Sequence, residues 1–401
     1  MTDLAPVAVS ERTERLGVTA AYLAQGLSYA TVVTSLPALK DRYSIDDDTV
    51  SLITLTVVLG AAGGSVLADR IAVKRGSKAG LIMGLGMQAV ALLLVATPLP
   101  FPAFWAMFAI YGIGLGMVDA AAAMQGVIVQ RRLGKSVMGS FFAASTAAGI
   151  VGALVMSGSA STSLGASIGM IVAGVFAAFV AGAGTRIFDP TMERAAREGT
   201  GPAPRIPRAG LWIFGFVVFA AFTADSTIST WSTVYLEDTL NASASVAPLG
   251  YAVYAAFTLI TRLTSDVVIR RFGRAPLALG TAVIAVVGIG VAGLLPVPVA
   301  AVVGFALAGT GVGALVPLAF SAAGDLDPRR GDEIVARVNL FTYGGSLIGA
   351  VLPGLLSDSI GLNASFLIAA VLLAPVLLTV RHFRTSTAAE YPEAEALDVE
   401  K

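Results

Sequence analysis

Two aspartates lie inside long apolar stretches of this 401-residue chain. Asp119 lies in the stretch 103–128, and Asp225 lies near the middle of the stretch 209–236. A carboxylate near the centre of an apolar, membrane-length helix costs about 2.5–3.5 kcal/mol on insertion scales, so such residues are usually functional. Each aspartate therefore has the chemistry to carry a proton or to pair with a charged solute. The alternative is a structural hydrogen bond between two helices.

Other polar side chains recur at helical spacing in stretches of the same kind. Asp225 and Ser229 are four residues apart, Tyr22 and Gln25 three apart, and Asn339 and Tyr343 four apart, so each pair shares a helix face. A polar face avoids lipid and lines water or a neighbouring helix, although packing or interfacial anchoring is the alternative for a single aromatic residue. The candidate residues for binding a substrate or a proton are Asp119, Asp225, Gln25, Tyr22, Tyr29, Gln125, Trp231, Ser229, Asn339 and Tyr343.

The stretches that must position these residues are those of a membrane protein. The chain is 56% hydrophobic and 13% charged, whereas soluble domains carry about 25% charged residues. Twelve apolar stretches are long enough to span a bilayer, which takes about 20 residues. They are 17–39, 49–69, 79–97, 103–128, 136–158, 164–186, 209–236, 246–268, 276–294, 298–320, 333–357 and 361–382. We predict an all-α membrane protein with twelve transmembrane helices.

Positive charge is concentrated in every second loop. The basic loops contain Arg70, Lys74, Arg75 and Lys78; Arg131, Arg132 and Lys135; Arg186 to Arg208; Arg270, Arg271 and Arg274; and Arg329 with Arg330. The loops between them, at 98–102, 157–165, 296–299 and 357–363, contain no Lys or Arg, and only Lys40 and Arg42 depart from the pattern. Because short basic loops stay in the cytoplasm, both termini are predicted to be cytoplasmic in a multi-pass protein of the cell membrane.

Several function classes are disfavoured by composition. The formal net charge is zero, so there is no basic stripe for nucleic acid. The chain has no Cys and one His, His382, and it has no phosphate-binding loop, so we expect no enzyme activity, no cofactor and no metal site. The expected partners are a small-molecule substrate, the lipid bilayer and, for energy coupling, protons. We expect a monomer.

The two halves of the chain repeat. Residues 69–76 read DRIAVKRG and residues 266–273 read DVVIRRFG, with a basic residue five positions and a glycine seven positions after each Asp, at an offset of 197 residues. Parallel six-helix repeats are typical of transporters. We predict a cytoplasmic N-terminus at 1–16, a six-helix bundle at 17–186, a cytoplasmic linker at 187–208, a second bundle at 209–384 and a cytoplasmic tail at 385–401.

The segment SVLADRIAVKRG (65–76) resembles the signature loop between helices two and three of the major facilitator superfamily. A narrower resemblance, to the YbjJ-like branch that is loosely related to fucose-type proton–sugar symporters, is carried by 36–45, 112–141, 229–238 and 262–273. The chain departs from that branch at Ala123 in place of Asn, Phe142 in place of His, and Ser35 in place of Arg. Asp119 corresponds to the acidic position of helix four in the fucose-type proteins, whereas Val33 stands where they have an Asp in helix one.

This resemblance implies two pseudo-symmetric six-helix bundles around a cavity lined by helices one, four, seven and ten. Gln25, Asp119, Gln125 and Trp231 are then the leading cavity residues. It also implies a latch at the cytoplasmic end, where the signature Asp meets a helix N-terminus of the other half. The latch candidates are Asp69, Arg70, Arg262, Asp266 and Arg271, with Arg262 expected to pair with Asp266.

The sequence thus predicts a secondary transporter for a small polar solute, with alternating access and proton coupling through Asp119. A neutral or weakly cationic solute is favoured, because a phosphate or dicarboxylate would require Arg in the spans. A passive facilitator, an efflux antiporter and a membrane sensor are the alternatives. The proline-containing signature of drug antiporters is absent from 143–154.

Overall fold

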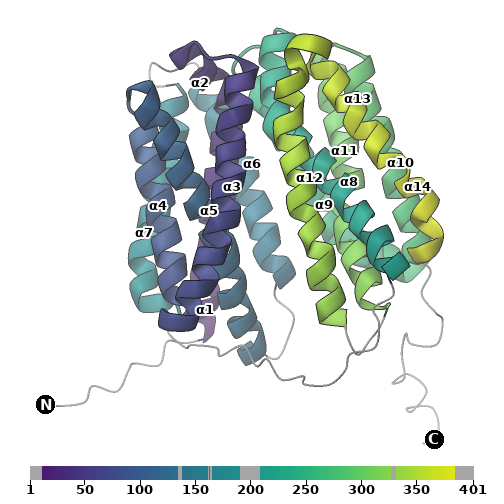
Figure 1. The fold of residues 1–401 in the computed structure, drawn as a ribbon, viewed down its shortest axis with the longest axis horizontal. Helices are drawn as coiled ribbons and strands as arrows, with labels where there is room; N and C mark the ends of the chain where they lie inside the picture. Colours follow the sequence, from purple (N-terminus) through teal and green to yellow (C-terminus); the bar gives the residue numbers. More distant parts are fainter. Residues whose placement is uncertain are drawn as a thin grey trace, which may run out of the picture.

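The computed structural model describes residues 11–133, 138–160, 162, 165–189, 208–326 and 331–383, and all its regular elements within these residues are helical. They are α1 (Glu11–Thr34), α2 (Leu36–Tyr43), α3 (Asp47–Arg75), α4 (Ser77–Val95), α5 (Phe101–Leu133), α6 (Met138–Ser159), α7 (Ala166–Ile187), α8 (Arg208–Val234), η1 (Tyr235–Thr239), α9 (Ala247–Phe272), α10 (Arg274–Leu294), α11 (Pro298–Gly324), α12 (Gly331–Ile360), α13 (Leu362–Leu373), α14 (Val376–Thr379) and η2 (Val380–Phe383). Figure 1 shows the helices arranged side by side in two groups.

Each of the twelve predicted stretches corresponds to a helix. Within the described residues, eleven helices are long and apolar enough to cross a membrane. The remaining long helix, α9, has 26 residues, but Tyr251, Tyr254 and Arg262 make it less apolar. The last stretch is divided at Pro375 into α13, α14 and η2, because proline cannot donate a helical hydrogen bond. The short helix α2, which contains Pro37 in its first turn, was not predicted.

The repeat in the sequence is also a repeat in the structure. Gly76 ends α3 and Gly273 ends α9, with φ angles of 81° and 84°. The backbone N–H of Gly76 donates to Ala72 O at 3.0 Å, and that of Gly273 donates to Ile269 O at 2.8 Å. Glycine adopts such positive φ angles without a steric penalty. Both pairs lie 197 positions apart, so the two halves use the same turn at equivalent places.

The helical ends correct one detail of the predicted signature loop. Helix α3 continues through Arg75, so Asp69 and Arg70 lie on a helix and not in a loop. The helix extends beyond its apolar stretch because its last residues, including Lys74 and Arg75, have ordinary helix propensity and lie favourably at a helix C-terminus.

The two halves, α1 to α7 and α8 to η2, contact each other mainly through α3 with α12 and α6 with α9. We call the end that contains α2 and the α10–α11 connection the Lys40 end. The opposite end, which contains Arg75, Lys78, Arg186 and Arg274, we call the basic end. Most of the predicted linker, 190–207, and the tail from 384 onward lie outside the described residues, so the domain boundaries stay a prediction.

The contact between α3 and α12 is tight at the Lys40 end and absent toward the basic end. A Cβ atom on Gly354 would lie 1.8 Å from Ser51 Oγ, and Ser51 is fully buried. Ala62 and Asp69 share the helix face of Ser51, three and five turns along α3, and both are exposed. On α12, Tyr343 shares the face of Gly354 three turns away and is 47% exposed. The seam between α3 and α12 is therefore closed at the Lys40 end and exposed toward the basic end.

Candidate functional site

Asp119 on α5 is held by a chain of two amides from neighbouring helices. Gln25 on α1 donates from Nε2 to Asp119 Oδ1 at 2.6 Å and to Leu115 O at 3.2 Å. Gln88 on α4 donates from Nε2 to Gln25 Oε1 at 2.7 Å. Gln25 and Gln88 are buried, whereas the Asp119 side chain is exposed. The Asp119 carboxylate thus accepts a hydrogen bond from a buried donor, Gln25, while the rest of its side chain is accessible.

Asp225 on α8 forms the matching group in the C-terminal half. Tyr254 on α9 donates its hydroxyl to Asp225 Oδ1 at 2.5 Å, and Arg262 lies within electrostatic range of the same carboxylate. Arg262 also donates from Nη1 to Thr146 Oγ1 on α6 at 3.3 Å. A polar group of the C-terminal half therefore reaches a helix of the N-terminal half.

Tyrosines connect the two aspartates across the boundary between the halves. The rings of Tyr29 on α1 and Tyr251 on α9 are 6.5 Å apart, inclined at 60°. Tyr29 lies beside Ser229, and it is within electrostatic range of both Asp119 and Asp225. Tyr111 on α5 lies within the same range of Tyr29, Tyr251 and Asp119. We call this group the interhalf polar cluster; its members are Gln25, Tyr29, Tyr111, Asp119, Asp225, Ser229, Tyr251, Tyr254 and Arg262.

Two buried hydroxyls near Asp119 have no hydrogen-bond partner among the described residues, those of Tyr22 and Tyr111. The Tyr22 ring stacks on Phe141 with centroids 5.5 Å apart at 12°, and meets Phe142 edge-on at 5.4 Å. Buried hydroxyls usually have a partner, so an unpaired one requires an explanation. Both hydroxyls are covered by the packed helices in this state.

Two of the leading cavity candidates have other contacts. Gln125 donates from Nε2 to Ser77 Oγ at 2.8 Å and to Asp189 O at 2.9 Å, and its Oε1 accepts from Asp189 N at 3.0 Å. Trp231 donates from Nε1 to Ala350 O at 2.9 Å and is fully buried. In both residues the polar atoms join helices within one half, so their role as cavity residues stays a prediction.

The other predicted binding residues divide between the cluster and the basic end. Ser229 is buried beside Tyr29, whereas Asn339 and Tyr343 are exposed on α12. They lie on its basic-end half, away from the cluster contacts. Gln88 and Tyr111 were not predicted. Gln88 is the sole amide in the stretch 79–97, and that isolated polar residue was a usable signal.

The predicted latch is not engaged at the residues that are described. Asp69 and Arg70 are exposed, and neither makes a hydrogen bond or an ion pair with the described residues. The Arg271 guanidinium lies 5.4 Å from the centroid of the Phe272 ring. The side chain of Asp266 lies outside the described part of the chain, so its pairing with Arg262 stays a prediction.

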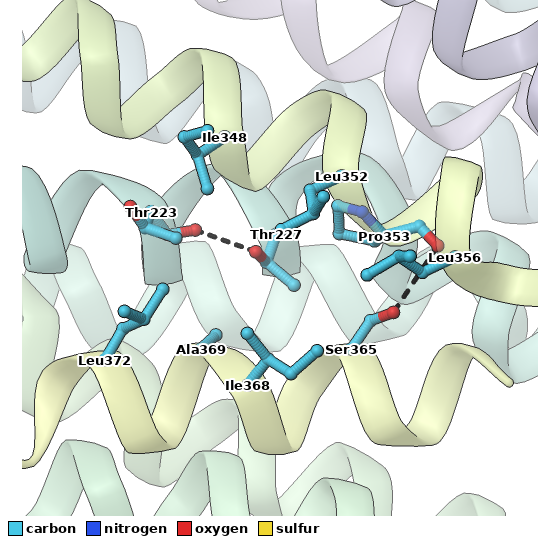
Figure 2. Close-up of a pocket in the computed structure, with 10 residues that line it drawn as sticks. All are labelled: Thr223, Thr227, Ile348, Leu352, Pro353, Leu356, Ser365, Ile368, Ala369 and Leu372. Carbon is cyan, nitrogen blue, oxygen red and sulfur yellow. Dashed lines mark hydrogen bonds between the residues drawn. The ribbon is translucent and has the colours of Figure 1, made fainter. Parts of the chain in front are cut away.

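Two further cavities lie outside the cluster. Figure 2 shows a crevice between α8, α12 and α13, where Thr227 donates to Thr223 O at 2.8 Å. Its volume of about 10 Å³ is at the limit for a single water. A groove of about 360 Å³ lies between α9, α10 and α11. Its Thr264 and Ser265 hydroxyls donate to carbonyls of their own helix.

The whole chain is similar to membrane transporters. It matches the family model of the Major Facilitator Superfamily at residues 18–333 and 211–398. The chain belongs to the major facilitator superfamily. An uncharacterized MFS-type transporter of Yersinia pestis is 27% identical over 377 residues, covering 92% of this chain and 95% of the relative. An uncharacterized transporter of Sinorhizobium fredii is 28% identical over 380 residues, covering 90% and 97%.

The fold is that of solved superfamily members. The crystal structure of the nucleoside transporter NupG, as its D323A mutant, has a TM-score of 0.74 at 13% identity, covering 93% of this chain and all of that one. The predictions of family, all-α fold and membrane transport are thereby confirmed. This superfamily member is a multi-pass membrane transporter and not an enzyme.

Proposed function

We propose that this transporter moves a small, polar, hydroxylated solute by alternating access, with Asp119 as the group that carries the coupling proton. The observation that carries the proposal is the hydrogen bond from Gln25 to Asp119 at 2.6 Å. It lies within the interhalf polar cluster, at the boundary across which the two halves must rock.

The amide chain gives Asp119 a defined role. Because Gln88 donates to Gln25 Oε1, the Gln25 amide nitrogen is oriented toward the Asp119 carboxylate. A hydrogen bond to an ionised acceptor is about twice as strong as a neutral one. Protonation of Asp119 weakens this bond and releases an amide donor for the solute, so binding of the proton and of the solute are coupled.

The cluster favours a neutral or weakly cationic solute. Tyr111 within it and Tyr22 beside it carry unpaired hydroxyls, and the Tyr29 and Tyr251 rings provide flat apolar faces. The Arg262 charge lies near Asp225, so it is already balanced and does not favour an anionic solute. The structurally similar NupG is a nucleoside transporter, so nucleosides join monosaccharides as the first solutes to test.

The orientation and the latch are parts of the same proposal. With the basic loops in the cytoplasm, the described state opens to the cytoplasm, and both termini lie on that side of the cell membrane. In the opposite state Asp69 would meet α12 and Asp266 would meet α6, aided by Arg70, Arg262 and Arg271. A passive facilitator and an efflux antiporter are the alternatives, and a monomer suffices for each.

Proteoliposomes that contain a pH-sensitive dye test the proposal. A solute from the panel is first identified by thermal stabilisation of the purified protein. For the wild type we expect proton movement with the solute and solute accumulation driven by a pH gradient. For Asp119→Asn we expect retained solute exchange but no proton movement and no accumulation. Asp358→Asn, at an exposed carboxylate of the Lys40 end, serves as the control.

The alternatives give different results in the same assay. Proton movement opposite to the solute indicates an antiporter, and solute movement without protons in the wild type indicates a facilitator. Accumulation by Asp119→Asn equal to that of the wild type would contradict the assigned role.

A further inference from the structure

The two cations that depart from the charge pattern both lie on α2, and one of them fixes this helix to the N-terminal half. Arg42 donates from Nη1 to Val95 O at 3.1 Å and from Nη2 to Ser167 Oγ at 2.9 Å. Ser167 in turn donates to Ala96 O at 2.8 Å. Arg42 thereby ties α2 to the ends of α4 and α7, so α2 moves with its own half.

The other cation, Lys40, has one carboxylate from each half. Its Nζ lies 2.5 Å from Asp47 Oδ1 on α3, in the same half. It also forms an ion pair with Asp238 on η1, in the opposite half. The Lys40 side chain is 14% exposed. Burial acts to lower the pKa of Lys40, but the hydrogen bonds to Asp238 and Asp47 raise it above its ordinary value, so the ammonium stays charged.

Neutral contacts close the same end beside this ion pair. Ser157 on α6 donates to Ser245 O, before α9, at 2.5 Å. Gly354 on α12 packs against Ser51 and Trp231 without room for a side chain. The contacts of Ser157 with Ser245 and of Gly354 with Ser51 join the two halves at the Lys40 end, whereas the faces of α3 and α12 are exposed toward the basic end.

We propose that Lys40 and Asp238 form an outer gate, an ion pair between the halves that keeps the Lys40 end closed while the basic end is open. The inference rests on the alternating access of the proposed function. Because Arg42 and Asp47 hold Lys40 on the N-terminal half, the bond that breaks on opening is the one to Asp238. Asp47 keeps the ammonium paired after the separation, which lowers the cost of opening.

The absence of cysteine from the chain makes a direct test available. A single Ser51→Cys substitution places a thiol in the buried contact of the closed end. In oriented proteoliposomes, a membrane-impermeant maleimide is added on the side of the Lys40 end. We expect Asp238→Asn to raise the labelling rate about two- to fivefold, the range for loss of a partly exposed ion pair. Asp47→Asn, which removes only the contact within one half, is the matched control and should leave the rate unchanged or lower it, because the ammonium then has no partner after opening.

A second variant removes the same ion pair from its other side, so the test does not depend on Asp238→Asn alone. Lys40→Gln should raise labelling as Asp238→Asn does. The double variant should then label no faster than either single one, because both substitutions remove the same interaction. Equal labelling in Asp238→Asn and Asp47→Asn, or additive effects in the double variant, would overturn the gate.

The labelling rate of a second thiol, placed toward the basic end, distinguishes failure of the gate proposal from failure of alternating access. Ala62→Cys lies on the exposed part of the α3 face and is labelled from the opposite side. Faster labelling of Ser51→Cys with slower labelling of Ala62→Cys supports both proposals. A faster rate at Ser51→Cys alone supports the gate and contradicts alternating access. An unchanged rate at Ser51→Cys with normal solute transport overturns the gate and leaves the proposed function standing.

Discussion

At the basic end of the N-terminal half, a single arginine balances two nearly buried carboxylates. Arg132 Nη1 donates to both oxygens of Glu14 at 2.7 Å, and the same guanidinium pairs with Asp189. The side chains of Glu14 and Asp189 are 9% and 2% exposed. The hydrogen bond to Glu14 and the nearby Asp189 raise the pKa of Arg132. This contact joins α1, α5 and the residue after α7.

Arg132→Met should therefore destabilise the folded protein. It removes the guanidinium that binds both oxygens of the buried Glu14 carboxylate, and an unsatisfied buried acceptor costs about 1–3 kcal/mol. Thermal unfolding in detergent should show a lower Tm. Arg186→Met, at an exposed arginine of the same end, should show no change; an equal loss in both variants would assign the effect to net charge.

At the same scale, the sequence predicted Asp119 and Gln25 as candidates because polar residues in an apolar stretch need a partner, and the hydrogen bond between them was not itself predicted. The roles of Gln125 and Trp231 were not predictable in this way. Helical periodicity says which residues share a face, but the rotation of that face toward a neighbouring helix depends on packing. The functional roles of Gln125, Trp231 and the other site residues stay predictions.

At the scale of the elements, close helix contacts depend on particular glycines. A Cβ on Gly116 of α5 would lie 1.8 Å from Ala61 O of α3, whereas a Cβ on Gly86 of α4 would meet nothing within 4 Å. Small residues of this kind let membrane helices approach closely. The membrane helices thus contain two classes of glycine, packed and open, and the sequence does not distinguish them.

Alanine substitutions should separate the two classes. Gly116→Ala forces α3 and α5 apart and should lower the free energy of unfolding by about 1–3 kcal/mol. Gly86→Ala should leave stability unchanged or raise it by up to about 1 kcal/mol, because alanine favours a helix. The measurement is the Tm of each purified variant in the same detergent. A Tm for Gly116→Ala at or above that of the wild type would contradict the contact.

The lengths of the elements were largely predictable, but their ends were not. Apolar length located every spanning helix, because the bilayer thickness sets it. Helix α3 continues to Arg75, beyond its apolar stretch, and α2 extends beyond residue 39, where the first stretch ends. The charged residues there have good helix propensity and extend a helix into water. These ends matter, since α2 contains Lys40 and the end of α3 contains Asp69.

At the scale of the whole molecule, the charge pattern predicts an orientation that labelling tests directly. Thr97→Cys lies at an exposed position of the Lys40 end, and Lys74→Cys lies at an exposed position of the basic end. In intact cells an impermeant maleimide should react with Thr97→Cys only, and Lys74→Cys should react after permeabilisation. The reverse result would contradict the predicted orientation in the membrane, and the open end would then face the outside of the cell.

The sequence predicted the twelve-helix fold but not which end is open. Both states of an alternating-access transporter bury the same apolar helix faces within each half, so composition and periodicity are identical in the two. The distinction comes from interhalf contacts such as those of Lys40 and Gly354, between residues far apart in the chain. Only their placement in three dimensions shows that these contacts exist.

The fit of Gly354 against Ser51 and Trp231 has a consequence for the cell that houses this protein. Because Gly354 lies directly against Ser51, the seam between α3 and α12 has no room for a side chain at this position. A bulkier residue at position 354 is expected to push the two helices apart and so to admit water, and with it small ions, at the end that should be sealed.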